Sequence, residues 1–416
     1  MTDPAADARP DDRPDDRPDD RPDDRPVIRL RPRAGRRLAA GAPWVYADEI
    51  AMDRRTRALA PGVVAVLEGP ERKALGAVAF NPASTIAARL LDPDPAAVIG
   101  ADWFARKLRA ALALRERLFD APFYRLAHAE GDGLPGVVID RFGDAVVIQP
   151  NAAWAAARLP DLIAALDAVI APQVIVINAA SRARALEGLD GESHLARGAL
   201  DGPVAVAMNG ATYMADLVGG QKTGLFYDQR PNHAFAARLA RGAEVLDVFT
   251  HVGGFGLAAL AAGAARVLAV DSAAPALALA EEGARRGGVA DRFETRRADA
   301  FDALRALAAE GRRFGLVVCD PPAFAPNKAA LEAGLRAYER TARLAAKLVE
   351  PGGFLALCSC SHAADAEAFR AACARGVLAA GRAGALIRAG AAGPDHPVHI
   401  GLPETGYLKA LFFRLS

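Results

Sequence analysis

The C-terminal part of the chain, from about residue 244, repeats a pattern that strongly limits its fold. Apolar runs typical of strands alternate with alanine-rich stretches typical of helices, and the runs read EVLDVFT, RVLAVD, RFETRRAD, FGLVVCD and GFLALCS. Such alternation predicts an α/β fold with a parallel sheet covered by helices on both faces. Ligands of these sheets bind at the carboxyl ends of the strands, so residues that follow the runs are candidates for a site.

Composition and charge narrow the class of protein. A chain of 416 residues with 52% hydrophobic and 24% charged residues predicts two or three compact domains. The 51 lysines and arginines nearly balance the 50 acidic residues, so any basic surface must be local. No apolar signal core and no membrane-length apolar segment stand out, so neither export nor membrane spanning is expected. The four cysteines do not have the spacing of a disulfide framework, which favours a reducing cytoplasm.

Shifts in composition divide the chain into four parts. Residues 1–26 contain four Asp-Asp-Arg-Pro repeats and are expected to form a disordered tail. Strand-like runs separated by Gly-Pro and Asn-Pro predict a small β-rich domain over residues 27–98. Residues 99–189 predict an amphipathic linking helix, over 102–119, followed by a small α+β domain, and residues 190–416 predict the α/β domain.

A basic run opens the β-rich domain, just before Trp44 and Tyr46. On extended backbone several of its guanidinium groups could share one face beside these aromatic rings, as suits RNA phosphates and bases. A solvated edge strand explains the pattern equally well. The arginines of this run are Arg29, Arg31, Arg33, Arg36 and Arg37.

Three successive strand ends carry residues that suit a nucleoside-containing ligand. The glycine-rich turn HVGGFG brings bare backbone and the start of a helix close to a ligand, although it lacks the spacing of a dinucleotide fingerprint. An aspartate at the second strand end can accept hydrogen bonds from both ribose hydroxyls, and one at the third can meet an adenine amino group. Each residue also has an ordinary structural interpretation, as part of a tight turn or as a helix N-cap. The candidates are Asp247, Gly253, Gly254, Gly256, Asp271 and Asp299.

The fourth strand end reads VVCDPPAF and suits a flat base. Its two prolines fix the backbone, so Asp320 is held rigidly near Phe324. A carboxylate can hydrogen-bond the edge of a base while an aromatic ring supports its face. A proline-rich turn capped by aspartate is the structural alternative.

The fifth strand end carries Cys358 and Cys360. Zinc would need two further ligands, and Cys319 and Cys373 form no second close pair, so no metal is expected. A disulfide between residues so close in sequence would be strained. Burial at a strand end accounts for Cys358 but poorly for Cys360, which has polar neighbours. A thiolate beside a nucleoside site is what C5 methylation of a pyrimidine needs, because C5 becomes nucleophilic only after a thiolate adds to C6.

Taken together, these segments resemble the bacterial large-subunit ribosomal RNA methyltransferase I family, whose members use S-adenosyl-L-methionine (SAM) to form 5-methylcytosine in 23S rRNA. LRPRAGRRLAAGAPWVYADEI is similar to its N-terminal PUA RNA-binding domain and EGDGLPGVVIDRFGD to its middle domain. GGQKTGLFYDQRPNH is similar to the segment leading into its methyltransferase fold. LDVFTHVGGFG, CDPPAFAPNK, CSCSH and the late DHPV and GYLK complete the resemblance.

The resemblance implies a Rossmann-like class I methyltransferase domain preceded by a PUA-like domain and a small α+β central domain. It implies that SAM is held by the glycine turn, Asp247, Asp271, Asp299 and Asp320, and that Cys360 and Asp320 act on the base. RNA contacts would come from Arg31, Arg33, Arg36 and Phe324. The implied partner is 23S rRNA or a large-subunit assembly intermediate, with no membrane.

Two departures from the family pattern stand out. Cys319 precedes Asp320, whereas many RNA cytosine methyltransferases carry a second cysteine beside the proline motif, so the group that assists enzyme release is unassigned. His233 replaces the usual arginine after QRPN, which we expect to alter a peripheral contact.

Three other functions remain open. The first is methylation of an exocyclic base amine, for which Cys360 would be dispensable. The second is a nicotinamide-dependent oxidoreductase, which the missing dinucleotide fingerprint disfavours. The third is a noncatalytic RNA-binding or ribosome-assembly protein.

Overall fold

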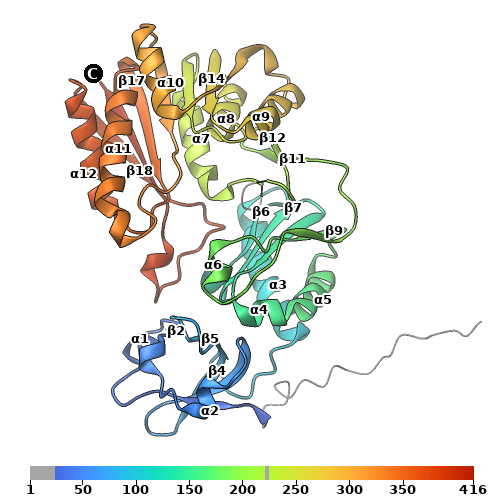
Figure 1. Ribbon diagram of the computed structural model, residues 1–416. Coiled ribbons are helices and arrows are strands. Elements are labelled where there is room, and N and C mark those ends of the chain that lie inside the picture. The colour runs from blue at the N-terminus through green and yellow to red at the C-terminus, as the bar shows by residue number, and fades with distance from the viewer. Residues whose placement is uncertain (1–23, 221–223) are drawn as a thin grey trace, which may run out of the picture.

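The computed structural model describes residues 24–220 and 224–416, which form three domains stacked one above another (Figure 1). The N-terminal domain is blue, the central domain green, and the C-terminal domain yellow to red. Most of the expected disordered tail, residues 1–23, lies outside the described residues. The α/β fold class with a preceding β-rich domain is confirmed.

The N-terminal domain is built on a five-stranded sheet in the order β1-β3-β4-β5-β2. β1 pairs with β3 in parallel, and the remaining pairs are antiparallel. Buried aliphatic and aromatic side chains, among them Ile28, Val45 and Phe80, fill its core. Its elements are β1 (Val27–Arg29), α1 (Arg36–Ala39), β2 (Trp44–Val45), η3 (Ala47–Glu49), α2 (Arg54–Arg57), β3 (Val63–Glu68), β4 (Ala74–Phe80) and β5 (Ala88–Asp92).

The expectation that the basic N-terminal run is extended is wrong beyond Arg29. Pro32 cannot donate to a strand ladder, and Arg33 adopts a φ of 69° in a turn. Gly35, with a φ of 80°, then starts the short helix α1, which carries Arg36. The side chains of Arg31, Arg33 and Arg36 are therefore exposed on a turn and a helix instead of along one strand face.

The central domain begins with helix α3 (Ala101–Leu118), which confirms the linking helix expected over residues 102–119. Its buried aromatic residues Trp103 and Phe104 pack against Trp154, whose ring stacks on that of Phe104 at 5.5 Å. A five-stranded sheet follows in the order β10-β9-β8-β7-β6. The elements are β6 (Phe123–His128), η4 (Ala129–Asp132), β7 (Val137–Phe142), β8 (Ala145–Pro150), α4 (Ala153–Ala157), α5 (Leu159–Val169), β9 (Val174–Ile177), α6 (Arg182–Ala185) and β10 (His194–Arg197), followed by the hairpin of β11 (Val204–Met208) and β12 (Ala211–Ala215).

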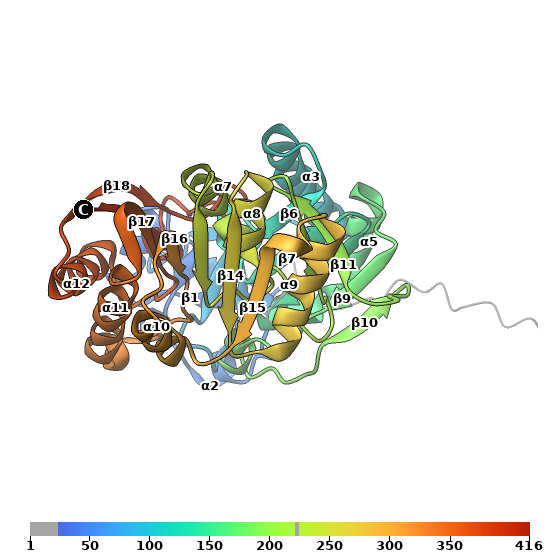
Figure 2. The ribbon, with the colours of Figure 1, turned by 90° about the horizontal axis from the view of Figure 1, so that it is seen from above.

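The C-terminal domain contains a seven-stranded sheet in the order β15-β14-β13-β16-β17-β19-β18. Helices α7 and α8 pack on one face, while α10, α11 and α12 pack on the other (Figure 2). The first five strands are parallel, as predicted, whereas β19 runs antiparallel to both neighbours, which the sequence pattern did not indicate.

The strands of this sheet are β13 (Glu244–Val248), β14 (Arg266–Asp271), β15 (Phe293–Arg297), β16 (Phe314–Cys319), β17 (Val349–Ser359), β18 (Gly384–Gly390) and β19 (Lys409–Leu415). The helices are α7 (Arg230–Leu239), α8 (Gly254–Ala261), α9 (Ala274–Arg286), α10 (Ala300–Ala309), α11 (Leu331–Ala346) and α12 (Ala366–Ala379), and the short 3-10 turns are η5 (Tyr227–Gln229), η6 (Ala290–Arg292), η7 (Lys328–Ala330) and η8 (Pro403–Thr405).

Strand register brings the expected site to one edge of the sheet. Val248 at the end of β13 is level with Val270 of β14 on one side and with Cys319 of β16 on the other. From β13 the sheet continues through β14 and β15 on one side and through β16 and β17 on the other. The strand order therefore reverses between β13 and β16. This is where open α/β sheets bind their ligands.

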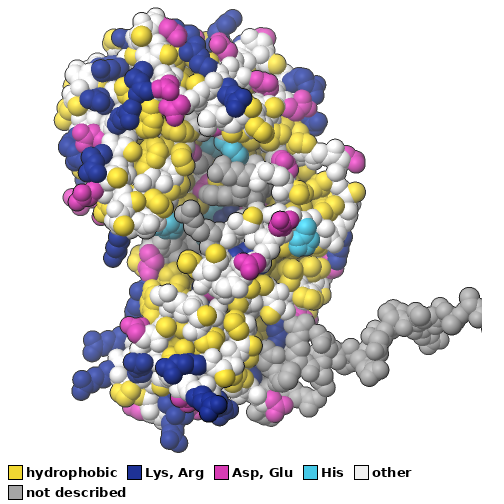
Figure 3. Space-filling model, viewed as in Figure 1, with side chains coloured by type: hydrophobic (Ala, Val, Ile, Leu, Met, Phe, Trp, Pro, Cys, Tyr) yellow, Lys and Arg dark blue, Asp and Glu magenta, His cyan; other side chains and the backbone are white. Residues whose placement is uncertain are grey.

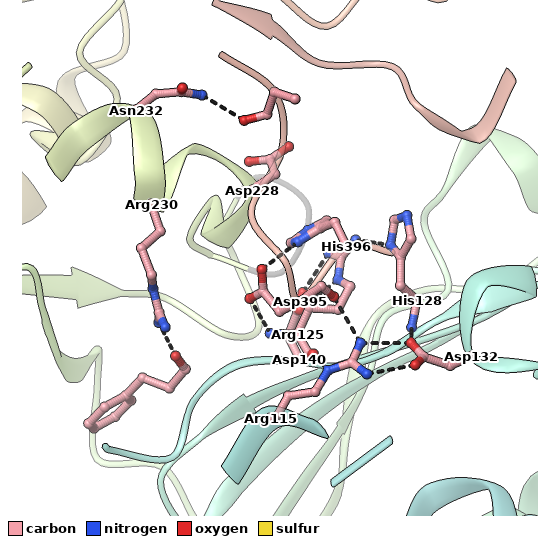
Figure 4. Close-up of polar contacts among 12 residues, drawn as sticks. Arg115, Arg125, His128, Asp132, Asp140, Asp228, Arg230, Asn232, Asp395 and His396 are labelled. Carbon is pink, nitrogen blue, oxygen red and sulfur yellow. Dashed lines mark hydrogen bonds and ion pairs between the residues drawn. The ribbon is translucent and has the colours of Figure 1, made fainter. Parts of the chain in front are cut away.

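A buried polar network joins the central and C-terminal domains (Figure 4). Arg115 is buried and forms a bidentate ion pair with Asp132, at 2.6 and 2.7 Å, while it also donates to the backbone oxygen of Asp395 at 2.9 Å. Arg125 pairs with the buried Asp140 in the same bidentate way. Both ion pairs lie within the central domain, where they compensate buried charges that would be costly alone. The link to the C-terminal domain is made at Asp395, whose backbone oxygen accepts from Arg115 and whose Oδ2 accepts the Arg125 amide. Among the described residues, no helix is both long enough and apolar enough to cross a membrane.

Candidate active site

Asp247 supports the glycine turn between β13 and α8 from beneath. Its Oδ2 accepts hydrogen bonds from the Thr250 hydroxyl at 2.6 Å and from the Gly256 amide at 2.8 Å. The side chain is fully buried, and burial raises the pKa of Asp247 to about 6. The structure therefore places this expected cofactor residue where it shapes the turn.

The turn itself has an unusual backbone. Phe249 and His251 adopt φ angles of 63° and 51°, a region that non-glycine residues rarely enter and that is common at functional sites. Gly253, with a φ of 85°, is the N-cap of α8. The bare backbone and the start of α8 thus lie at the carboxyl end of β13, in an arrangement that suits an anionic or polar ligand.

His233 packs directly under this turn, so the expectation of a peripheral contact is wrong. A Cβ at Gly254 would lie 2.8 Å from Nε2 of His233, and the His233 ring lies 4.4 Å from that of Phe255. Burial lowers the pKa of His233 to about 3, so the ring is neutral. The residue at this position therefore determines how closely α7 and the glycine turn approach.

Asp271 and Asp299 lie at the ends of the next two strands. Asp271 accepts the His251 amide through Oδ2 and the Ala273 amide through Oδ1, both at 2.9 Å, which ties the end of β14 to the glycine turn. Asp299 is exposed and caps α10 by accepting from the amides of Phe301 and Asp302. The structure thus places Asp271 in contact with the glycine turn. Asp299 is the N-cap of α10, which is the structural alternative given for it in the sequence analysis.

Asp320 follows β16 and is held by residues that the sequence analysis did not assign. Its Oδ2 accepts a hydrogen bond from Nε2 of Gln229 at 2.9 Å, and Oε1 of Gln229 accepts from Nδ2 of Asn232 at 2.7 Å. Gln229 and Asn232 are buried at the start of α7. This relay fixes the carboxylate of Asp320 at the carboxyl end of β16.

A buried hydroxyl network, defined by Ser359, Tyr338 and Ser361, positions Cys360. The hydroxyl of Ser359 donates to Oη of Tyr338 at 2.8 Å, and Oη of Tyr338 and Oγ of Ser361 are hydrogen-bonded at 2.7 Å. Both serines are fully buried, whereas Cys360 between them is only partly buried. Oγ of Ser361 also accepts the Ala325 amide at 2.9 Å, which joins this loop to the loop that follows Asp320.

Cys358 lies one residue before the end of β17 and has a different environment. It is 1% exposed and packs in the core beside Ala356 and Phe412. Burial raises the pKa of the Cys358 thiol well above its usual value, and the charge of Asp320 raises it further. A thiol held in its neutral form is a poor nucleophile.

Lys409 places a positive charge beside the Cys360 loop. Its ammonium group donates to the backbone oxygens of Ser361 at 2.6 Å and Ala364 at 2.7 Å. Burial lowers the pKa of Lys409, and its interaction with Cys360 opposes that shift. A cation close to a cysteine stabilises the thiolate form.

Phe324 and the three arginines occupy different places. Phe324 is partly buried, and its ring lies 5.0 Å from that of Tyr338, so much of it contributes to packing. Arg31, Arg33 and Arg36 are exposed on the N-terminal domain, whereas the strand-end residues belong to the C-terminal domain. The described part of the chain contains no cluster of three or more potential metal ligands.

Comparison with known families agrees with this geometry. Residues 160–413 match the model of the S-adenosylmethionine-dependent methyltransferase family, and residues 28–93 match that of a PUA-like domain. A protein from Streptococcus mutans described as a SAM-dependent methyltransferase shares the fold, with a TM-score of 0.78 at 18% identity over 94% of this chain and all of the other. A methyltransferase structure complexed with SAH gives the same score and identity over 94% of this chain and 99% of that one.

The fold and these matches define a SAM-dependent methyltransferase with an N-terminal PUA-like domain. A ribosomal RNA large subunit methyltransferase I from Shewanella denitrificans is 36% identical over 93% of this chain and 99% of the relative. The protein of that name from Cronobacter sakazakii is 34% identical over 88% of this chain and 93% of the relative. The chain belongs to the ribosomal RNA large subunit methyltransferase I family.

Proposed function

We propose that this protein methylates C5 of a cytosine in 23S ribosomal RNA through a covalent adduct between Cys360 and C6 of the base. The observation that carries the proposal is the contrast between two cysteines at one strand end. Cys358 is fully buried, whereas Cys360 is partly accessible beside Lys409 and is joined through Ser361 to the loop that follows Asp320. Exocyclic-amine methylation gives no role to such a cysteine.

The residues at the first strand ends fit SAM. Asp271 closes the glycine turn through the His251 amide and lies at the end of the strand next to β13, as a ribose-binding carboxylate would. The glycine turn and the start of α8 would hold the rest of the cofactor, with Asp299 and Asp320 at the rim and Asp247 supporting the turn. SAM supplies the electrophilic methyl group that C5 of the adduct takes up.

The remaining chemistry belongs to side chains of this chain. The Cys360 thiolate, stabilised by the positive charge of Lys409, adds to C6 of a flipped cytosine and makes C5 nucleophilic. Asp320, fixed by Gln229, hydrogen-bonds the edge of the ring. After C5 is methylated, loss of its proton lets the C5–C6 double bond re-form and expels the Cys360 thiolate.

The RNA substrate is proposed from the domain composition and the relatives. PUA domains bind RNA, and Arg31, Arg33 and Arg36 are exposed on this domain. The relatives carry ribosomal RNA of the large subunit in their name. The substrate would be 23S rRNA, free or in an assembly intermediate, which places the protein in the cytoplasm.

The experiment is to incubate the protein with labelled SAM and 23S rRNA from a strain that lacks the corresponding gene, and to digest the product to nucleosides. The proposal predicts label in 5-methylcytidine at one position that is unmodified in the deletion strain. Label in an N-methylated nucleoside would support amine methylation instead. No transfer of label to rRNA would contradict both.

A further inference from the structure

The connection between β18 and β19, residues 391–408, touches all three domains. It leaves the sheet after Gly390, which pairs with Ala410, and returns at Lys409, which pairs with Ser359 beside Cys360. Connections longer than about 12 to 15 residues are uncommon in compact domains unless they serve a function. This one starts and ends at the edge of the sheet that carries the active site.

Contacts with the central domain fix the first half of this connection. Oδ2 of Asp395 accepts the Arg125 amide at 3.1 Å, and Arg115 donates to its backbone oxygen. His396 is buried, and its ring lies 4.8 Å from that of His128. The chain then passes so close to Gly131 that a Cβ there would lie 2.2 Å from the Pro397 oxygen.

Contacts with the PUA-like domain and with η5 fix the second half. Glu404 pairs with Arg37 of the basic run at 2.5 Å. A Cβ on Gly401 would lie 2.6 Å from the Gly41 oxygen, so the two backbones are in close contact. Tyr407 then donates to Oδ2 of Asp228 at 2.5 Å, immediately before the chain re-enters the sheet.

Between these anchors the chain exposes two β-branched apolar side chains. Val398 is 51% exposed and Ile400 is 101% exposed. Single exposed hydrophobic residues are common, but these two lie on a segment held at both ends. We call Val398 and Ile400 the apolar tip. In Figure 1 this connection is the red loop that descends from the C-terminal domain toward the PUA-like domain, and Figure 3 shows the outline of the molecule indented between the same two domains.

We propose that the apolar tip contacts RNA and packs against bases that neighbour the target cytosine. The inference rests on the proposed function, because a cytosine must leave its stack to reach Cys360. Proteins that unstack nucleic acids often insert isoleucine, leucine or phenylalanine beside the disrupted base step. Glu404 pairs with Arg37, which brings the connection next to the basic run. The exposed Arg31, Arg33 and Arg36 of that run offer the positive charge that phosphates on either side of such a step require. The apolar tip belongs to a connection that contacts the PUA-like domain and re-enters the sheet opposite Ser359, the neighbour of Cys360, and such a position fits unpaired RNA.

The test compares a Val398→Thr, Ile400→Ser double variant with a Leu378→Ser control. Leu378 is 67% exposed on α12, a helix on the outer side of the C-terminal domain (Figure 1), and it supplies an exposed apolar residue outside the connection. Affinity for the rRNA substrate is measured at several salt concentrations, and SAM affinity is measured by calorimetry. The double variant should bind RNA about tenfold more weakly, with an unchanged salt slope, because an apolar contact releases no counterions. SAM affinity should match that of the unmodified protein.

Each other outcome has a definite meaning. Equal RNA affinity of the double variant and the unmodified protein, or an equally weakened affinity in Leu378→Ser, would overturn the inference while the proposed function stands. A dimer of the unmodified protein that dissociates in the double variant would identify a second copy of the chain as the occupant, and would also overturn it. An unmodified protein that forms no 5-methylcytidine would remove the proposed function and this inference with it.

Discussion

Oγ of Ser361 accepts the amide of Ala325 at 2.9 Å, and this contact joins the loop of the candidate nucleophile to the loop of the candidate base-binding aspartate. Ser361→Ala would leave a buried amide without its acceptor and remove a partner of the Tyr338 hydroxyl. Leaving a buried group without its hydrogen-bond partner lowers the free energy of unfolding by about 1 to 3 kcal/mol. We expect a lower midpoint in urea and a lower single-turnover rate with unchanged SAM affinity. Ser416→Ala, which removes an exposed hydroxyl, is the control. A rate equal to that of the unmodified protein would mean that this contact does not position Cys360.

Asp271 provides the most direct test of the cofactor site. Asp271→Ala removes the proposed acceptor of the ribose hydroxyls and should weaken SAM binding by about 1 to 3 kcal/mol, the usual scale for charge-assisted hydrogen bonds. Asp365→Ala is a matched control, because Asp365 accepts an amide at the start of α12 and has no proposed ligand role. Calorimetry is the measurement, and unchanged affinity in Asp271→Ala would reject the assignment.

The basic surface of the PUA-like domain predicts a salt-dependent effect on RNA binding. Changing Arg31, Arg33 and Arg36 to glutamine should weaken RNA binding and reduce the slope of log K against log salt by about one unit for each phosphate that is no longer neutralised. The control changes Arg54, Arg55 and Arg57 of α2, which are exposed elsewhere on the same domain. If both triple variants behave alike, the contribution of the first set is general charge and not a docking surface.

The histidine pair between the central and C-terminal domains predicts how stability depends on pH. Burial lowers the pKa of His128 to about 2 and the pKa of His396 to about 3. In the unfolded chain both pKa values return to about 6.5, so the unfolded state binds more protons below that pH. Stability is therefore fully present above pH 6.5 and falls by about 1.4 kcal/mol per pH unit for each histidine as the pH decreases further.

Urea unfolding at pH 7.5, 6.5 and 5.5 measures this dependence. The double variant His128→Asn, His396→Asn should show a smaller change in midpoint between pH 6.5 and 5.5 than the unmodified protein. His194→Asn, which changes an exposed histidine on β10, should retain the full change. Equal pH dependence in the two variants would show that other groups cause the acid sensitivity.

The parts of the fold and site that the sequence predicted are those with a local signal. Alternating strands and helices predicted the parallel sheet, and the strand ends placed Asp271, Asp320 and Cys360 at one edge. The antiparallel β19 was not predicted, since a strand pattern carries no direction. The arginine run was wrongly expected to be extended for a different reason, because Pro32 and Gly35 override the alternation that suggested a strand.

The supporting residues were not predicted, because their partners lie far away in sequence. Gln229 contacts Asp320 from 91 residues away, and nothing in the spacing of the DQRPN segment points to that aspartate. His233 was expected at the periphery, yet it packs against the glycine turn through the contact between α7 and α8. Ser359 and Ser361, which flank Cys360, offered the one local hint, since two serines in an apolar strand end need buried partners.

The central claim is that Cys360 is the nucleophile and Cys358 is not. RNA that contains 5-fluorocytosine at the target position should trap a covalent complex with the unmodified protein and SAM, because fluorine cannot leave from C5 as a proton does. Cys360→Ala should form no complex and transfer no methyl group to ordinary RNA, whereas Cys358→Ala should retain both activities. Methyl transfer by Cys360→Ala at an undiminished rate would contradict the account and would favour amine methylation guided by Asp320.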